Sequence, residues 1–333
     1  PELLSAVLKR AGHQCELLVL QAVGRRRIMA ELARREPHMV AFSISSFGYR
    51  WALELAAEVK ASLGAVTVLG GPHPTYFPEV AASRGVDAAV RGEGEGAILD
   101  LARAVEEGAD LDAIPNLILP DGAGGVVVNP LRPLIEDLDS LPDADRDLVF
   151  AHRPLRDLSY KRFLVGRGCP YGCSYCFNAA ARRMYRGLGR YVRHRSPERV
   201  VAEILEVKRR FGVATVGFVD DTFTTDREWL LRFLELYRDE VGLPFTCLTR
   251  INEVDEGVAG ALAAAGCHYA SFGVEVGNER IRNQVLKRRM SDDDIRAGAA
   301  MLRRAGIPFL TFNMFGVPGE TAADGVTTIR LNA

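Results

Sequence analysis

The sequence predicts an α/β protein made of two consecutive units of mainly parallel β-sheet. Three observations lead to this fold class. Apolar strands alternate with amphipathic helices from about residue 160 onward, a similar alternation occupies the first 115 residues, and polar or glycine-rich residues follow most of the strands. A length of 333 residues also suits two domains. We expect a doubly wound, Rossmann-like sheet in the first unit.

The first unit opens in an amphipathic helix over residues 2–11, which Gly12 ends. Short apolar runs then alternate with helical patterns. Because the chain opens in a helix, we expect the strand that should precede it to be missing, so that the fold is truncated at this end. The other predicted elements are strands over residues 16–20, 39–44, 66–69 and 88–90, helices over residues 27–35 and 49–63, and a helix that follows Glu95 and runs to about residue 107.

A hairpin and a linker are expected between the two units. The runs Leu117–Leu119 and Val126–Val128 flank Asp121-Gly122-Ala123-Gly124-Gly125, which has the composition of a turn. The predicted domain organisation is residues 1–115 for the first unit, 116–158 for the hairpin and linker, and 159–333 for the second unit.

Helix-start and helix-stop signals outline the second unit. Ser196, Asp226 and Ser291 precede helical patterns as N-caps, and Gly212 follows one. The predicted strands cover residues 163–167, 214–219, 245–249, 269–274 and 309–314, and the helices cover residues 197–211, 226–237, 256–265 and 291–305. In such a parallel layout ligands bind at the carboxyl ends of the strands. A sixth strand is absent, so we expect truncation at the C-terminus as well.

Three cysteines, Cys169, Cys173 and Cys176, lie in one short loop with C-x3-C-x2-C spacing. A four-iron cluster has four corners, and three thiolates leave one iron open to a small molecule. Structural zinc is the weaker alternative, because it needs four ligands and the remaining cysteines, at positions 15, 247 and 267, are isolated. A disulfide framework or three buried structural cysteines suit this glycine- and proline-rich loop less well.

The run Cys169-Pro170-Tyr171-Gly172-Cys173-Ser174-Tyr175-Cys176, placed after the apolar Phe163-Leu164-Val165, resembles the radical S-adenosylmethionine (SAM) superfamily. The resemblance implies a partial (β/α)6 TIM-type barrel and a [4Fe-4S] cluster whose open iron chelates SAM. In that family an electron from the cluster cleaves SAM to methionine and a 5′-deoxyadenosyl radical, which takes a hydrogen atom from the substrate. No catalytic side chain is assigned.

The resemblance also implies contacts to SAM at the strand ends. Asp220 and Asp221 would meet its amino group, although the family's usual Gly-Gly-Glu is here Asp-Asp-Thr, and Asp221 has the alternative of capping the next turn. Arg250 would pair with the carboxylate, its alternative being an ordinary surface ion pair. Glu275 would accept from the ribose hydroxyls. The remaining SAM-binding predictions are Tyr175 beside the last cysteine, and Gly316 and Pro318 in an adenine-side loop.

The first unit contains the runs Ala11-Gly12-His13, Ser43-Ile44-Ser45-Ser46-Phe47, Gly70-Gly71-Pro72-His73-Pro74-Thr75 and Gly92-Glu93-Gly94-Glu95. With these runs it resembles the cobalamin-binding domain of B12-dependent radical SAM proteins. Small residues in such loops let the backbone approach a large flat ligand. The residues implied to contact cobalamin are Ser43, Ser45, Ser46, Phe47, Gly70, Gly71, Pro72, His73, Gly92, Glu93 and Glu95. The D-x-H-x-x-G motif of many B12 proteins is absent, so we expect His73 to line the pocket rather than ligate cobalt. A domain that kept the fold but lost the cofactor, or a nucleotide-binding Rossmann domain, is the alternative.

Composition and charge indicate which classes of binding partner to expect. The net charge is −1, which gives no electrostatic case for nucleic acid, and we interpret the basic residues between 182 and 195 as a solvated face rather than an anion or RNA site. The sequence shows no signal peptide and no apolar run long enough to span a membrane. Unpaired cysteines favour the reducing cytoplasm. We expect a small-molecule substrate and an external electron donor of the flavodoxin or ferredoxin type.

Three functions remain open at this point. The first is a cobalamin-dependent methyltransferase that acts on an unactivated carbon or phosphorus. The second is a cobalamin-dependent radical SAM cyclase or oxidoreductase of the tetrapyrrole type. The third is a cobalamin- or redox-sensing module without turnover, which the intact cysteine loop and the polar strand ends disfavour.

Overall fold

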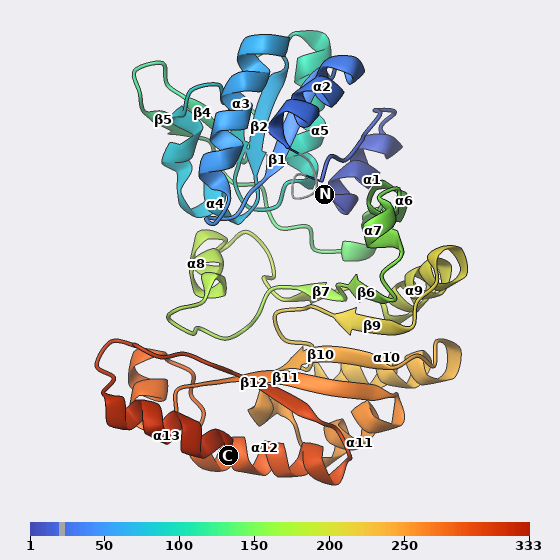
Figure 1. Cartoon of the computed structure of the whole chain (residues 1–333), viewed down its shortest axis with the longest axis vertical. Coiled ribbons are helices and arrows are strands. Elements are labelled where there is room, and N and C mark those ends of the chain that lie inside the picture. The colour runs from blue at the N-terminus through green and yellow to red at the C-terminus, as the bar shows by residue number, and fades with distance from the viewer. Residues whose placement is uncertain (20–23) are drawn as a thin grey trace. The chain divides into compact units, whose positions relative to one another are not determined.

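The computed structural model describes residues 1–19 and 24–333 (Figure 1). The chain forms two compact units, residues 1–134 with 141–152, and residues 135–140 with 153–333. Each unit contains a five-stranded sheet. Over the described ranges, no helix has both the length and the apolar character that crossing a bilayer requires.

The sheet of the first unit has the strand order β1-β2-β3-β4-β5. The first three strands are parallel, and the last two continue the sheet as antiparallel strands. These strands are β1 (Met39–Ser43), β2 (Val66–Gly70), β3 (Ala88–Val90), β4 (Leu117–Pro120) and β5 (Val126–Val128). The predicted hairpin is therefore formed as β4 and β5, and it extends the first sheet. Asp121 holds its turn by accepting the backbone N–H of Ala123 and of Gly125, each at 2.8 Å.

Helices cover both faces of this sheet. Successive strand residues point to opposite faces, so Val68 belongs to one core with Leu101 of α5, while its neighbour Leu69 belongs to the other core with Leu55 of α3. This confirms the doubly wound arrangement. The helices of this unit are α1 (Glu2–Arg10), α2 (Arg25–Arg35), α3 (Tyr49–Leu63), α4 (Pro72–Tyr76), α5 (Glu95–Glu107) and α6 (Arg146–Phe150).

The strand predicted over residues 16–20 of the first unit is wrong over residues 16–19. Residues 16–19 form no strand, and Leu20 lies outside the described residues. Side chains, rather than a neighbouring strand, hold this segment. Glu16 forms an ion pair with Arg35 at 2.5 Å, and the carbonyl oxygen of Leu17 lies 2.9 Å from Nε2 of His152.

The sheet of the second unit is parallel throughout, in the order β12-β11-β10-β9-β6. Its strands are β6 (Tyr160–Phe163), β9 (Thr215–Phe218), β10 (Phe245–Thr249), β11 (Cys267–Glu275) and β12 (Phe309–Asn313). Its main helices are α7 (Arg153–Arg156), α8 (Phe177–Met184), α9 (Pro197–Phe211), α10 (Arg227–Glu240), α11 (Glu256–Ala264), α12 (Asp292–Arg304) and α13 (Ala322–Asn332). Consecutive parallel strands joined by helices are the arrangement of a partial barrel, as the sequence predicts.

The predicted caps of the second unit are present. The side chains of Ser196, Asp226 and Ser291 each accept a backbone N–H from the first turn of the helix that follows, and Ser291 forms a capping box with Asp294. Gly212 ends α9 with a φ of 70°. These local signals explain why α9 begins and ends at the residues that the sequence predicts.

The first strand of the second unit differs from its prediction. The sequence predicts one strand over residues 163–167, but β6 ends at Phe163, and a separate short strand, β7 (Gly166–Arg167), pairs antiparallel with β8 (Arg193–His194). Glycine is needed at this pairing, because a Cβ on Gly166 would lie 2.6 Å from the carbonyl oxygen of Arg193. The chain therefore leaves the barrel earlier than predicted and enters the cysteine loop from a small ribbon.

Candidate functional site

The cysteine loop connects β7 to α8 in the second unit. Gly168 turns the chain with a φ of 86°, and a Cβ there would lie 2.3 Å from the carbonyl oxygen of Tyr191. At the other end of the loop, Cys176 is the N-cap residue of α8, where the helix dipole favours a thiolate. Glycine and the helix start thus set the two ends of a loop that carries all three predicted ligands.

The three thiols of the loop interact electrostatically with one another. Burial is the main cause that raises the pKa of Cys169 to about 11, and charge on Cys176 and Cys173 contributes to the same rise. All six cysteines of the chain are free. Among the described residues, no three His, Cys, Asp or Glu side chains converge closely enough to hold a single metal ion. A four-iron cluster does not require its ligands to converge on one point, because each thiolate binds a different iron. Three neighbouring free thiols on one loop are therefore compatible with a cluster.

The cysteine loop is anchored to residues more than a hundred positions later. Ser174 donates its backbone N–H to the carbonyl oxygen of Leu286 at 3.0 Å and its hydroxyl to that of Val285 at 2.7 Å. Within the loop, the N–H of Cys176 donates to the carbonyl oxygen of Cys173 at 3.2 Å. The segment around residues 285 and 286 therefore fixes where the last two cysteines lie.

A three-residue polar cluster joins the cysteine loop to the end of β11. The Tyr175 hydroxyl donates to Oε1 of Glu275 at 2.8 Å and accepts from Nη1 of Arg288 at 2.6 Å. Arg288 also forms an ion pair with Glu275 at 3.1 Å and donates to the carbonyl oxygen of Gly273 at 2.6 Å. Glu275 has a φ of 69°, a conformation that ordinary side chains rarely adopt and that often marks functional sites. Two predicted SAM contacts are thus neighbours.

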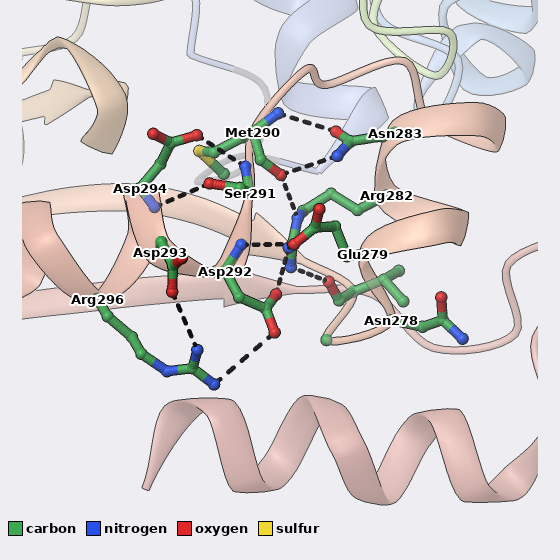
Figure 2. A network of polar contacts seen from close by, with 12 residues as sticks. Asn278, Glu279, Arg282, Asn283, Met290, Ser291, Asp292, Asp293, Asp294 and Arg296 are labelled. Atoms are coloured by element: carbon green, nitrogen blue, oxygen red, sulfur yellow. Dashed lines mark hydrogen bonds and ion pairs between the residues drawn. The ribbon is translucent and has the colours of Figure 1, made fainter.

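A buried arginine organises the segment that carries these anchors (Figure 2). Arg282 is fully buried within a π-helix over Ile281–Val285 and forms ion pairs with Asp292 and, at 3.6 Å, with Glu279. It also donates to the backbone carbonyl oxygens of Val276 at 3.0 Å and Met290 at 2.9 Å. This network ties the end of β11 to the start of α12. It therefore sets the position of the intervening loop, which includes the residues that hold Ser174.

Arg250 lies at the cysteine loop, not in the surface ion pair considered as its alternative. It follows β10, is 5% exposed, and places Nη1 3.8 Å from Sγ of Cys173. Its guanidinium carbon lies 3.8 Å from the centre of the Tyr171 ring, and its other terminal nitrogen donates to the carbonyl oxygen of Arg288. The Tyr171 hydroxyl donates to Glu253 at 2.6 Å. A cation therefore lies beside Cys173, and an aromatic ring covers that cation.

The two aspartates after β9 have different roles. Asp220 is buried, and its Oδ1 accepts the backbone N–H of Val165 at 3.0 Å and of Gly166 at 2.8 Å. Burial raises the pKa of Asp220 to about 7, against these two hydrogen bonds. Its oxygens thus hold the segment between β6 and β7, and the SAM contact of Asp220 stays a prediction. Asp221 is exposed, and partial desolvation raises its pKa while the Asn178 side chain lowers it.

In the predicted adenine-side loop, an acidic side chain accepts hydrogen bonds from the backbone. The Oε2 of Glu320 accepts the backbone N–H of Gly316 at 2.5 Å and of Val317 at 3.0 Å. Gly316 has a φ of 77°, and nothing lies within 4 Å of the position of a Cβ there. Gly316 and Pro318 are both exposed, so the backbone of this loop is open to a flat ligand.

In the first unit, the predicted loops after β1 and β2 lie against each other. Gly71 has a φ of 93°, and a Cβ there would lie 2.8 Å from the carbonyl oxygen of Ile44. His73 is buried and stacked between the rings of Tyr49 and Phe77, at 4.2 and 4.9 Å between ring centres. Its Nδ1 lies 3.0 Å from Oγ of Ser46, and burial lowers its pKa. His73 is thus held between two rings and a serine, and its place in a cobalamin pocket stays a prediction.

The loop after β3 is held by Asn116, which the sequence analysis did not single out. Its side-chain amide donates to the carbonyl oxygens of Arg91 at 2.8 Å and Glu93 at 3.4 Å. The N–H of Gly92 donates to Thr75 at 3.1 Å, which links this loop to the one after β2. Of the other residues predicted to contact cobalamin, Ser43, Ser45 and Phe47 are exposed, whereas Glu95 is buried. Gly70 and Pro72 lie on either side of Gly71.

The basic residues between 182 and 195 are only partly a solvated face. Arg193 is buried and donates to the carbonyl oxygen of Ile135 at 2.7 Å. Arg195 forms an ion pair with the buried Glu203, whereas Arg190 pairs with Glu136 in an exposed position. Part of this positive charge is thus used inside the second unit.

Some residues of the site carried no signal in the sequence. Arg288 lies in a loop without a motif and reaches Glu275 only through the fold. Asn178 is buried beside Cys176, with Nδ2 3.6 Å from its sulfur, and accepts from the Tyr191 hydroxyl at 2.6 Å. The only available hint for Asn178 was its position next to the cysteine motif.

Comparison with protein families gives two matches. The model of the radical SAM superfamily matches residues 163–331, slightly more than half of the chain, and the model of the B12 binding domain matches residues 2–102. The first match contains the cysteine loop and the polar strand ends. The second contains the glycine-rich loops described above.

Individual proteins agree with these matches. The chain is 30% identical, over 267 residues, to the uncharacterized methyltransferase PH0819 of Pyrococcus horikoshii, covering 79% of this chain and 56% of that protein. It is 31% identical, over 281 residues, to an anaerobic magnesium-protoporphyrin IX monomethyl ester cyclase of Rubrivivax gelatinosus, covering 81% and 49%. The chain thus spans about half the length of the curated relatives it matches.

Solved structures share the fold. The radical SAM methyltransferase TsrM of Kitasatospora setae, with cobalamin and a [4Fe-4S] cluster bound, superposes with a TM-score of 0.81 at 21% identity, over all of this chain and 70% of that one. The cobalamin-dependent radical enzyme OxsB, with aqua-cobalamin and SAM bound, gives a TM-score of 0.80 at 17% identity, over 99% of this chain and 48% of that one. The chain belongs to the radical SAM superfamily and carries a B12-binding domain ahead of its radical SAM region.

Proposed function

We propose that this protein is a cobalamin-dependent radical SAM enzyme that transfers a methyl group to an unactivated carbon or phosphorus centre. The observation that carries the proposal is the group of three free cysteines on one loop at the end of a parallel β-sheet. That loop is anchored by the neighbouring strand ends through Tyr175 and Glu275. In the proposed organisation, residues 1–115 bind cobalamin, 116–158 form the hairpin and linker, and 159–333 form the radical SAM barrel.

Cys169, Cys173 and Cys176 would hold a [4Fe-4S] cluster. The loop fits such a group because its three thiols are free and close enough for charge on one to affect another. When bound, the cluster would supply the electron that cleaves SAM to methionine and a 5′-deoxyadenosyl radical. Burial raises the pKa of the Cys169 thiol, so binding to iron would have to overcome this cost of forming the thiolate.

The strand ends and the loop after β12 would position SAM. Glu275, which Arg288 and Tyr175 hold in place, would accept hydrogen bonds from the ribose hydroxyls. The exposed carboxylate of Asp221 would meet the ammonium group of SAM. The backbone at Gly316 and Pro318 would contact the adenine. These groups would bind and orient SAM for the chemistry that the cluster would supply.

Cobalamin would bind at the glycine-rich edge of the first sheet. Two features of this edge fit a large flat ligand. Gly71 lies in contact with the backbone of Ile44, where a side chain would fill the space, and Phe47 is fully exposed on the neighbouring loop. Gly92, with a φ of 77°, completes the edge from the loop after β3. His73 would line this site and leave cobalt without a histidine ligand from that position.

A cyclase reaction is the second candidate. Anaerobic magnesium-protoporphyrin IX monomethyl ester cyclases are among the relatives, beside the Cytidylyl-2-hydroxyethylphosphonate methyltransferase of Streptomyces wedmorensis and the Hopanoid C-3 methylase of Methylococcus capsulatus. These relatives act on dissimilar molecules, so the substrate remains unassigned beyond a small molecule. A non-catalytic sensing module would leave the polar strand ends without a purpose.

One experiment separates these functions. The protein is reconstituted under anaerobic conditions with iron, sulfide and cobalamin, then reduced with dithionite and supplied with SAM. Formation of both 5′-deoxyadenosine and S-adenosylhomocysteine supports methyl transfer, whereas 5′-deoxyadenosine alone supports the cyclase type. Neither product, from protein with a verified four-iron cluster, would contradict the enzyme proposal. In the cell, we propose that a flavodoxin- or ferredoxin-type donor supplies the electron in the reducing cytoplasm.

A further inference from the structure

Arg250 is a buried cation that no carboxylate contacts, although its charge helps to lower the pKa of the more distant Asp294. Its side chain is 5% exposed, and a guanidinium stays charged at every physiological pH. Across the ranges that the structure describes, no carboxylate is in ion-pair contact with it, and its Nε has no hydrogen-bond partner. Arg282 provides the contrast, because it is also buried but is paired with Asp292. A buried charge without a counter-ion in contact costs free energy, so an anion beside the guanidinium would stabilise Arg250.

The contacts of Arg250 point toward the cysteine loop. Its Nη1 lies 3.8 Å from the sulfur of Cys173, and the Tyr171 ring covers its planar face. The other terminal nitrogen is held by the carbonyl oxygen of Arg288, which fixes the direction of the fork. Of these three neighbours, the Cys173 thiol is the one that becomes an anion when it binds iron.

We propose that Arg250 is the counter-ion of the cluster at its Cys173 corner and that its charge raises the cluster's reduction potential. This inference rests on the proposed function, because it requires a cluster on the three cysteines. Reduction adds one electron to the cluster and neither forms nor breaks a bond. The product carries one more negative charge, and a nearby buried cation stabilises that product more than the oxidised form.

Glu253 carries a negative charge near Arg250, so its removal should shift the reduction potential in the opposite direction. Its carboxylate accepts from the Tyr171 hydroxyl at 2.6 Å and from the Thr222 hydroxyl at 3.0 Å, so it lies at the hydroxyl end of the ring that covers Arg250. Its negative charge opposes that of Arg250 at the cluster. Removing this charge should therefore raise the potential, while removing the charge of Arg250 should lower it.

The experiment measures the potential of the reconstituted cluster by dithionite titration, followed by EPR of the reduced protein, without SAM or substrate. In Arg250→Gln, we expect the equilibrium constant for one-electron reduction to fall at least tenfold, which is a shift of about 59 mV to more negative potential. Arg250→Lys keeps the charge and should restore most of the difference. Glu253→Gln should move the potential the other way.

A matched control removes another buried cation. Lys161, which is 3% exposed, lies near the start of β6 and donates to the backbone carbonyl oxygens of Leu155 and Arg156. Lys161→Gln should leave the potential within the error of the wild-type value. A shift equal to that of Arg250→Gln would show that any lost buried charge has this effect, and would overturn the proposal.

The remaining outcomes are also decisive. An unchanged potential in Arg250→Gln with full iron content overturns the inference, and a weakened affinity for SAM in that variant would then assign Arg250 to the SAM carboxylate. If Arg250→Gln does not load a cluster, the sign of the shift in Glu253→Gln decides, since a fall or no change contradicts the charge argument. A wild-type protein that assembles no four-iron cluster is a failure of the proposed function itself.

Discussion

The hydroxyl of Tyr175 donates a hydrogen bond to Oε1 of Glu275 at 2.8 Å, across a hundred residues of sequence. This contact joins the cysteine loop directly to the carboxyl end of β11. Arg288 completes it by donating to the same hydroxyl and pairing with the same carboxylate. The loop that would hold the cluster and the carboxylate that would hold the ribose therefore form one structural unit.

Removing this hydroxyl should weaken SAM binding without removing the cluster. Tyr175→Phe removes one of the hydrogen bonds that position Glu275 and Arg288, and the loss of such a charge-assisted bond corresponds to a roughly 5- to 10-fold higher Kd. The measurement is equilibrium SAM binding to the reconstituted protein. Tyr237→Phe is the control, because its buried hydroxyl donates to the carbonyl oxygen of Leu243 in a different part of the unit. Wild-type affinity in Tyr175→Phe would contradict the proposed role.

Cys173→Ala should abolish assembly of the four-iron cluster. Two thiolates cannot hold a cluster that needs a protein ligand on three irons. We expect the broad visible absorbance of the reconstituted protein to disappear and its bound iron to fall to near zero. Cys15→Ala is the control, because Cys15 is a free thiol of the first unit. A four-iron signal retained by Cys173→Ala would refute the ligand assignment.

Asp220 should make the stability of the cluster-free protein depend on pH. Its pKa of about 7 lies above the ordinary 3.8, so the folded protein binds more protons than the unfolded chain between these values. Stability contributed by this group is therefore present at low pH and is lost as the pH rises through 7, by about 2–4 kcal/mol.

Asp220→Asn tests this prediction cleanly, because Oδ1 of asparagine can still accept from Val165 and Gly166. Urea unfolding of the apo protein at several pH values between 5 and 8 should show a flatter profile in the variant, with a gain in stability at pH 8. Parallel profiles in the two proteins would mean that Asp220 is not responsible.

Gly71→Ala should destabilise the first unit and prevent cobalamin binding. The new Cβ would lie 2.8 Å from the carbonyl oxygen of Ile44 at a φ of 93°, and strain with overpacking costs about 2–4 kcal/mol. Gly12→Ala is a matched control with a φ of 98° and nothing within 4 Å, so it should cost less and leave binding intact. Thermal unfolding and titration with cobalamin, followed by absorbance, provide the two measurements. Equal effects of the two substitutions would count against a close-packed cradle at position 71.

Elements with strong local signals were predictable to the residue. α3 ends at Gly64 with a φ of 66°, and α9 has both its serine cap and its glycine stop. The cysteine loop was equally clear, because its spacing has few alternative meanings. The failures depend on the fold. Residues 16–19 have the composition of a strand, but an ion pair and a histidine contact hold them instead.

The site was predictable as a set of strand ends, but its contacts were not. The sequence places Asp220 and Asp221 together, yet only the fold shows that Asp220 is used by the backbone of Val165 and Gly166. Arg288 could not be found, because no motif surrounds it and its partners lie far away in the chain. Propensity and spacing describe neighbours in sequence, whereas these bonds are made by tertiary packing.

The long separation of these bonds has a consequence for the maturation of the protein. Ser174 is held by carbonyl oxygens at positions 285 and 286, which lie in a segment that Arg282 ties to both β11 and α12. During synthesis the three cysteines leave the ribosome about a hundred residues before the groups that fix their loop. The geometry of the loop is complete only after this later segment has folded. An iron–sulfur donor would therefore meet three thiols on a loop without its anchoring hydrogen bonds in the nascent chain, and three thiols on an anchored loop in the finished protein.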